Sequence, residues 1–189
     1  IHPEPATLVA ATLMTIGLFA KTALFPLHLW LPPAHAGAPA AASAVLSAVV
    51  VKGSFFLVVR LWFDVMPGML GSAGAQLFGA LGAAAIIFGS VVALQQQRLK
   101  LLIAYSTVAQ IGYLFLIFPL ALDASAQLQG SGALTGGIVQ AISHATAKAA
   151  MFMAAGLIYA ALGHDRIAEL GGVARALPMT IFAFALGGV

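Results

Sequence analysis

The stretch Leu18–Pro39, "LFAKTALFPLHLWLPPAHAGAP", places Lys21 inside an apolar run and then interrupts that run with four prolines. Proline removes a backbone donor and clashes with the preceding helical turn, so a helix through Lys21 is expected to break near Pro26. Broken helices at membrane depth are tolerated where they line a cavity, and in transporters their ends face the ion. Lys21 would then lie near a helix C-terminus, whose partial negative charge favours a cation. An ordinary proline kink in a scaffold helix is the alternative.

Composition indicates an integral membrane chain. Of 189 residues, 62% are hydrophobic and 7% are charged, whereas about a quarter of the residues in soluble domains are charged. The absence of cysteine excludes disulfides and thiolate metal sites. No basic run of the kind that binds nucleic acid is present. Because the chain opens on Ile1 without a basic signal region, we expect a fragment of a longer polypeptide.

The apolar segments are long enough to cross a bilayer, which takes about 20 helical residues. They are expected to be helices, because the backbone finds no water in the hydrocarbon layer. The sequence thus predicts an all-α, polytopic helix bundle forming a single transmembrane domain over 1–189. Its expected helices are 7–31 (broken near 22–26), 43–65, 74–95, 99–122, 134–162 and a truncated 177–189.

The charges at or beyond the ends of these segments predict an orientation. One side of the membrane would hold the basic residues of two links, and the positive-inside rule makes that side cytoplasmic, in a bacterial inner membrane. A chance asymmetry in a small sample is the alternative. The cytoplasmic set is Arg98, Lys100, Arg166 and Arg175, and the opposite side would hold Glu4, Arg60, Asp64 and Asp123.

Three lysines lie well inside apolar segments: Lys21, Lys52 and Lys148. A lysine at the centre of a membrane helix costs about 2.5–3.5 kcal/mol on insertion scales, and such residues usually face a water-filled cavity or an ion path. Burial disfavours the charged form of an amine, so a buried lysine can act as a switchable proton carrier. Snorkelling of the side chain to the headgroups is the alternative.

Polar side chains accompany the lysines. His144 and Lys148 are four residues apart and share a helix face, which suits a proton relay. A neutral His144 bonded to a neighbouring helix is the alternative. The remaining candidates are expected either to support a polar path or simply to form interhelical hydrogen bonds. They are Ser106, Gln110 and Tyr113, which share a face, and Gln140, one turn before His144.

Nothing in the sequence indicates an enzyme active site of its own. We find no pairing of nucleophile and base, no nucleotide-binding loop and no metal-ligand spacing, so neither a metal nor another cofactor is expected. His28 and His35 are seven residues apart across prolines, which matches no common metal site.

Four segments together resemble a known family. They are "KTALFPLHLWLPPAHAGAP" (21–39), "VLSAVVVKGSFFLVVRLW" (45–62), "LKLLIAYSTVAQIGYLFL" (99–116) and "ISHATAKAAMFMAAGLI" (142–158). The chain is similar to the antiporter-like membrane subunits shared by respiratory complex I (NADH-quinone oxidoreductase), Mrp-type sodium/proton antiporters and membrane-bound hydrogenases. The segment "AYSTVAQIGY" is closer to the Mrp D-like branch.

This resemblance implies a fragment of an inverted-repeat antiporter-like fold. By position, Lys21 matches the family's central proton-binding lysine on the broken seventh helix, and Lys52 matches the linking lysine or histidine of the eighth. His144 and Lys148 match the eleventh-helix pair on the exit side. The acidic partner of Lys21 would lie outside this chain, and Pro33 replaces an aspartate that many members carry.

The resemblance implies proton translocation, with sodium as an alternative ion, in a multisubunit complex within the lipid bilayer. Quinone or NADH chemistry would belong to partner subunits. The alternative function is a structural membrane anchor of a redox complex, without an ion path of its own.

Overall fold

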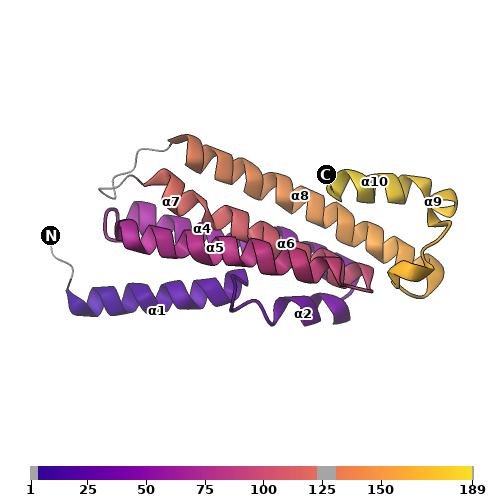
Figure 1. Cartoon of the computed structure of the whole chain (residues 1–189), viewed down its shortest axis with the longest axis horizontal. Helices are drawn as coiled ribbons and strands as arrows, with labels where there is room; N and C mark the ends of the chain where they lie inside the picture. The colour runs from indigo at the N-terminus through magenta and orange to yellow at the C-terminus, as the bar shows by residue number, and fades with distance from the viewer. Residues whose placement is uncertain (1–3, 123–130, 189) are drawn as a thin grey trace.

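The computed structural model describes residues 4–122 and 131–188, and helices are the only regular secondary structure in this part of the chain. The helices run roughly along one long axis and form an elongated bundle (Figure 1). Within the described residues, five helical segments are long and apolar enough to cross a membrane. The predicted all-α membrane bundle is therefore confirmed.

The first helix breaks where the prolines predict. α1 spans Pro5–Thr22 and ends at Ala23, which adopts a left-handed backbone conformation with φ of 60°. An irregular stretch that contains Pro26 follows, and the short helix α2, Leu31–Gly37, resumes beyond it. Lys21 thus lies in the last turn of α1, close to the exposed carbonyl end of the helix.

The second apolar segment, Ala40–Val65, is helical throughout but not uniform. It consists of α3 (Ala40–Val45), a π-helical turn η1 (Leu46–Val50), α4 (Val51–Val59) and a second π-helical turn η2 (Arg60–Val65). Single π-helical turns inside α-helices are rare and occur frequently at functional sites. The first of them ends two residues before Lys52, and no feature of the sequence predicts it.

α5 (Gly71–Leu94) and α6 (Leu99–Phe115) pack closely together because glycines line their contact. A methyl group built on Gly82 would lie 2.6 Å from the carbonyl oxygen of Gly112, and one on Gly89 would lie 2.6 Å from the backbone nitrogen of Ala109. Small residues of this kind let membrane helices approach backbone to backbone. A short helix, α7 (Ile117–Ala121), continues the direction of α6.

α8, Ser131–Leu162, is the longest helix and runs diagonally across α6 and α7 (Figure 1). The chain then turns through η3 (Ile167–Glu169) and α9 (Val173–Ala176) into α10 (Pro178–Gly188), which packs along α8. Asp123, which the sequence analysis assigned to the outer side, lies outside the described residues.

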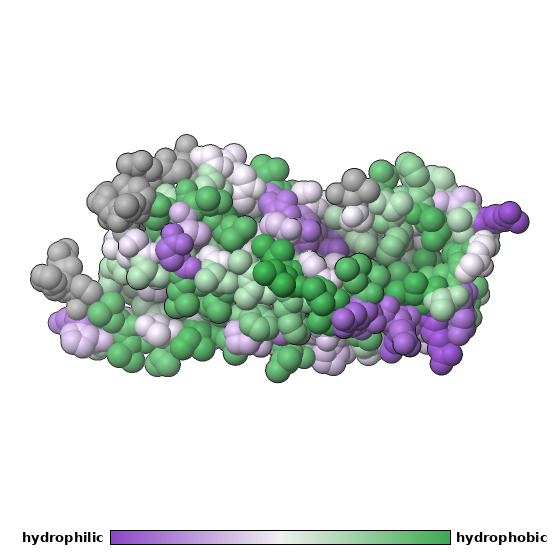
Figure 2. Space-filling model, in the orientation of Figure 1, coloured by the Kyte–Doolittle hydropathy of each residue, from purple (hydrophilic) through white to green (hydrophobic). Residues whose placement is uncertain are grey.

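Aromatic rings fill the core between α1, α5 and α6. The rings of Phe19, Phe78 and Phe115 meet edge to face, with centroids 4.8 Å apart for Phe19 and Phe78 and 5.1 Å apart for Phe19 and Phe115. Figure 2 shows hydrophobic side chains over much of the length of the bundle, with hydrophilic ones gathered toward one end and in a patch at mid-length. This distribution suits a bundle surrounded by lipid.

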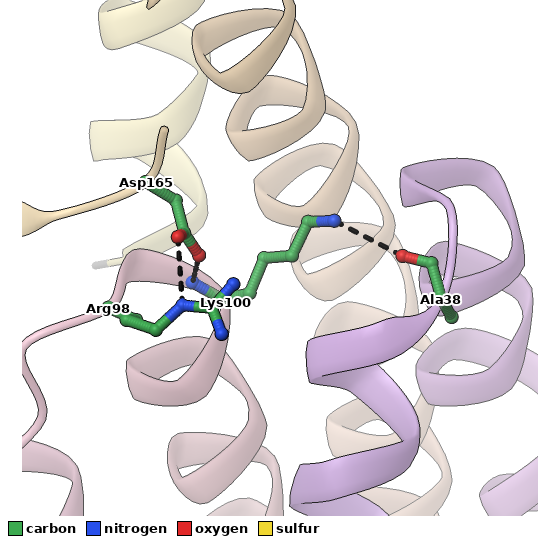
Figure 3. A network of polar contacts seen from close by, with 4 residues as sticks. All are labelled: Ala38, Arg98, Lys100 and Asp165. Carbon is green, nitrogen blue, oxygen red and sulfur yellow. Dashed lines mark hydrogen bonds and ion pairs between the residues drawn. The ribbon is translucent and has the colours of Figure 1, made fainter. Parts of the chain in front are cut away.

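A polar network fastens the hydrophilic end (Figure 3). The buried carboxylate of Asp165 accepts a 2.9 Å bond from Arg98 Nε and a 3.4 Å bond from the backbone N–H of Lys100. The Lys100 ammonium donates to the carbonyl oxygen of Ala38 at 3.1 Å. Lys100 therefore joins the α8–η3 connection and the end of α2 to the start of α6.

This position corrects the expectation that Lys100 is a loop charge. The residue lies in the first turn of α6, and its side chain is only 8% exposed. Its ammonium also lies 5.4 Å from the centre of the Tyr159 ring, a favourable cation–π contact. Two neutral partners, a carbonyl and an aromatic face, therefore compensate for its burial.

Candidate functional site

Lys52 is buried in the first turn of α4, two residues after the first π-helical turn. Its side chain is 9% exposed, and its ammonium donates a hydrogen bond to the backbone carbonyl of Ser47, inside that turn. Burial of an ammonium is tolerated only where polar groups compensate for the lost water. The π-helical turn supplies one such group, because it carries the Ser47 carbonyl beneath the following turn of the helix.

Ser47 connects Lys52 to α6. Its hydroxyl lies 3.1 Å from the hydroxyl of Thr107, and both side chains are fully buried. The Thr107 hydroxyl donates to the carbonyl oxygen of Ile103 at 2.9 Å. Because the Thr107 proton is engaged with that carbonyl, Ser47 is the donor in the bond between the two hydroxyls.

Lys148, in α8, is linked to the same Ile103 carbonyl through Ser106. Its side chain is 4% exposed, and its ammonium donates to the Ser106 hydroxyl at 2.7 Å. The Ser106 hydroxyl in turn donates to the carbonyl of Ile103 at 2.8 Å. Two branches therefore end on one shared acceptor: Lys148 through the Ser106 hydroxyl, and the Ser47 hydroxyl through that of Thr107. Lys52 adjoins the second branch through the backbone carbonyl of Ser47 and not through its hydroxyl.

A carbonyl oxygen accepts hydrogen bonds but has no proton to pass on. The shared carbonyl of Ile103 thus holds the two branches in place without forming a continuous proton wire. Proton transfer between Lys52 and Lys148 requires the serine and threonine hydroxyls to rotate toward water or toward another titratable group. His144 is such a group.

His144 lies one turn before Lys148 on α8 and is 4% exposed. Neither of its ring nitrogens has a hydrogen-bond partner within the described residues. The ring lines a cavity of about 400 Å³ together with Lys148, Ser106 and Ser143. A cavity of this size with several polar groups has room for ordered water, which can satisfy a buried imidazole.

A pair of glutamines closes one end of this cavity. Gln140 Nε2 donates to Gln110 Oε1 at 2.7 Å, which joins α8 to α6. Both side chains also line a second cavity of about 460 Å³, where Tyr113 lies half-exposed. The bond therefore separates two cavities that lie along the same groove between α6 and α8.

The comparisons with known proteins agree with this arrangement. Residues 1–189 match the family described as NADH:quinone oxidoreductase/Mrp antiporter, TM. The chain belongs to this family. The resemblance stated from the four sequence segments is confirmed.

Curated relatives in this family come from both of its main branches. The chain is 36% identical to NADH-quinone oxidoreductase subunit N of Desulforudis audaxviator, over 96% of this chain and 35% of that protein. It is 37% identical to a subunit of a probable K(+)/H(+) antiporter of Rhizobium meliloti, over 95% of this chain and 17% of that protein. Our chain thus spans about a third or less of the length of these relatives.

Solved structures of family relatives share the fold. A chain of the Mrp complex from Dietzia sp. superimposes with a TM-score of 0.87 at 28% identity, covering 97% of our chain and 33% of that chain. A chain of the membrane-bound sulfane sulfur reductase, an archaeal respiratory membrane complex, gives a TM-score of 0.84 at 29% identity, with coverages of 98% and 37%. The chain therefore has the membrane fold of an antiporter-like subunit.

Within this family segment, Lys21 stands apart from the other predicted site residues. Its side chain is exposed, whereas Lys52, His144 and Lys148 are buried. The buried part of the expected lysine and histidine axis consequently comprises Lys52, Lys148 and His144 in the described residues. Lys21 lies on the outer surface of α1, accessible to groups beyond this chain.

Sequence reasoning missed Ser47, Thr107 and the carbonyl of Ile103. Serine and threonine are common in membrane helices, and nothing in the sequence marks the π-helical turn that positions Ser47. The one available signal was spacing, since Ser43 and Ser47 lie four residues apart and both are fully buried. His28 and His35 stack on Phe25 and Phe152, with centroids 5.5 and 4.4 Å apart.

Proposed function

We propose that this family segment carries protons across the membrane through Lys52, Lys148 and His144. The observation that carries the proposal is the burial of both lysines beside neutral partners only. The ion pairs within residues 4–122 and 131–188 all involve other basic residues, namely Arg60, Arg98, His164 and Arg166. Two buried amines that lack a fixed counter-charge suit a site where charge arrives and leaves.

The electrostatics of the pair supports alternating occupancy. Lys148 bonds Ser106, and Lys52 bonds Ser47, whose hydroxyl meets Thr107 next to Ser106. Two positive charges held against this one cluster disfavour each other, so a proton that arrives at one lysine favours release from the other. The imidazole of His144 lines the cavity beside Lys148, so it suits the intermediate carrier.

The supporting groups have separate tasks in this proposal. Ser106 holds the Lys148 ammonium, Thr107 holds the Ser47 side chain beside Lys52, and the Gln110–Gln140 bond controls passage along the groove that continues to Tyr113. Lys21 binds protons at the broken helix and takes its acidic partner from outside this chain. The prolines around Pro26 keep that end of α1 open.

The proposed setting is a complex of the NADH-quinone oxidoreductase or cation/proton antiporter type, in a bacterial inner membrane. The names of the two curated relatives support these two types of complex. In the antiporter type, potassium or sodium would be the counter-ion. The basic end of the bundle, with Arg98, Arg166 and Arg175, would face the cytoplasm.

A structural anchor is the second candidate function. The bonds of Lys52 to Ser47 and of Lys148 to Ser106 favour it, because they would hold helices together even if no proton moved. The two functions differ in what a neutral substitution does. If the lysines carry protons, neutralising one stops transport in an assembled complex. If they only hold helices together, neutralising one lowers the amount of assembled complex.

Inverted membrane vesicles that contain the full-length protein distinguish the two. Acidification is followed with a pH dye after adding NADH and then after imposing a sodium or potassium gradient. We expect Lys52→Ala to abolish acidification at unchanged abundance, and Arg175→Gln, an exposed control, to leave it intact. Equal acidification by wild type and Lys52→Ala would overturn the proposal.

A further inference from the structure

The break after α1 is tied together by the side chain of Trp30. The indole Nε1–H donates to the carbonyl oxygen of Ala20 at 2.7 Å, ten residues earlier in the chain. Ala20 immediately precedes Lys21. The same carbonyl also accepts the backbone N–H of Ala23 at 3.1 Å, so it is held from two directions.

The turn that ends α1 is strained. Ala23 has φ of 60° and ψ of 39°, the left-handed region that glycine adopts freely and that costs an alanine roughly 1–2 kcal/mol. Its side chain is fully buried. A strained residue of this kind persists only where its surroundings hold it in place.

Trp30 supplies that constraint. Its ring packs against the main apolar core, which fixes the direction of the N–H bond. Breaking a helix at membrane depth leaves carbonyl groups that water cannot reach, and an unmatched one is expensive. The indole therefore adds a second donor to a carbonyl that the N–H of Ala23 already bonds, and so resists relaxation of the strained turn.

We propose that Trp30 is a positioning residue for Lys21. It locks the last turn of α1 and thereby sets the direction of the lysine side chain across the break. This inference rests on the proposed function, in which Lys21 binds protons. The charged groups on the elements that adjoin α1 are Lys52 in α4, the ion pair Arg60–Asp64 in η2, and Lys100 in the first turn of α6, which bonds the Ala38 carbonyl.

A second tryptophan offers a matched control. Trp62 Nε1 donates to the Thr15 hydroxyl at 3.1 Å, so it also bonds α1 from another element. That bond meets a side chain in the helix interior, two turns from the break. Trp30→Phe and Trp62→Phe thus each remove one indole donor to α1, but only the first one loosens the turn beside Lys21.

The experiment uses the full-length protein in its native membrane. Lys21→Cys is combined with each tryptophan variant, and the rate of labelling by a permeant maleimide is measured. A hydrogen bond worth about 0.5–1.5 kcal/mol corresponds to a roughly 2- to 10-fold change in an equilibrium. We expect a change of that size in labelling rate with Trp30→Phe, and none with Trp62→Phe.

Proton transport provides the second readout, in the same variants with Lys21 intact. Trp30→Phe should move the pH of half-maximal transport by about 0.3–1 unit, the logarithm of that fold-change. Trp62→Phe should lower the rate at most, without moving the pH profile. Identical labelling and pH profiles in both variants would overturn the inference.

If Trp30→Phe does not assemble, benzothienylalanine is placed at position 30 instead. This residue keeps the shape of the indole ring and has sulfur in place of the N–H. If this isostere also prevents assembly, the N–H is needed for folding and the positioning role is refuted. Failure of the proposed function looks different. In that case Lys21→Ala leaves transport unchanged, while the labelling rates still decide whether Trp30 orients the residue.

Discussion

Ser106 and Thr107 are neighbours in α6 and direct their hydroxyl groups to one acceptor, the carbonyl oxygen of Ile103, at 2.8 and 2.9 Å. Yet they serve different lysines, because Ser106 accepts from Lys148 and Thr107 joins Ser47 beneath Lys52. A single turn of α6 therefore holds both the serine that accepts from Lys148 and the threonine that bonds the residue beneath Lys52. Because each hydroxyl belongs to a different branch, substituting one of them tests one branch at a time.

Ser106→Ala removes the hydroxyl that accepts from the Lys148 ammonium while changing little volume. Loss of a hydrogen bond to a charged group costs about 1.5–3 kcal/mol, so we expect transport to fall roughly 10- to 100-fold. Dye-based acidification rates at matched abundance check this. Ser143→Ala in the same cavity is the control, and an equal loss there would contradict the assignment.

Gln140→Leu breaks the bond that joins α8 to α6 and separates the two cavities. Interhelical hydrogen bonds in membranes contribute about 0.6 kcal/mol on average, so assembly should survive with a slightly lower melting temperature. Transport should change more than stability does. A double-mutant cycle with Gln110→Leu measures the coupling, and purely additive effects would argue against the pair.

Asp165→Asn tests the network at the basic end. It removes the negative charge that Arg98 and the first turn of α6 share, at a side chain that is 4% exposed. We expect the free energy of unfolding to fall by about 1–3 kcal/mol. The control is Asp64→Asn, whose exposed pair with Arg60 should contribute about 0–1 kcal/mol. Thermal melts in detergent compare the two, and equal losses would refute a special role for Asp165.

Gly82→Leu should prevent close packing of α5 on α6. Even a Cβ atom there would lie 2.6 Å from the carbonyl oxygen of Gly112, a backbone atom that cannot move aside alone. We therefore expect loss of the assembled protein, measured as abundance in the membrane. Gly17→Leu, where no atom lies within 4 Å of the added Cβ, should assemble normally unless that face meets another subunit.

The fold was largely predictable because the apolar runs and the prolines are strong, local signals. The break near Pro26 follows because proline interrupts a helix. The burial of Lys52 and Lys148 follows because charged side chains within a membrane span usually face the bundle interior. The family resemblance rested on four segments together, and the comparisons confirmed that resemblance.

The rest depended on which side of each helix meets its neighbour, which a sequence does not state. Lys21 has an apolar context like that of Lys52, yet only Lys52 turns toward the core. The same reason explains why Lys100 seemed a loop charge. The meeting of two hydroxyls at Ile103 arises from packing of α6 against both α3–α4 and α8, so no single segment encodes it.

The most direct test of the central claim measures protons moved per electron, or per counter-ion, in vesicles that carry Lys52→Met or Lys148→Met. Methionine keeps the length of the side chain and removes its charge. If the lysines carry protons, the ratio falls to near zero while the complex remains assembled. If the ratio per assembled complex stays at the wild-type value and only abundance falls, the lysines are structural and the proton path proposed here is wrong.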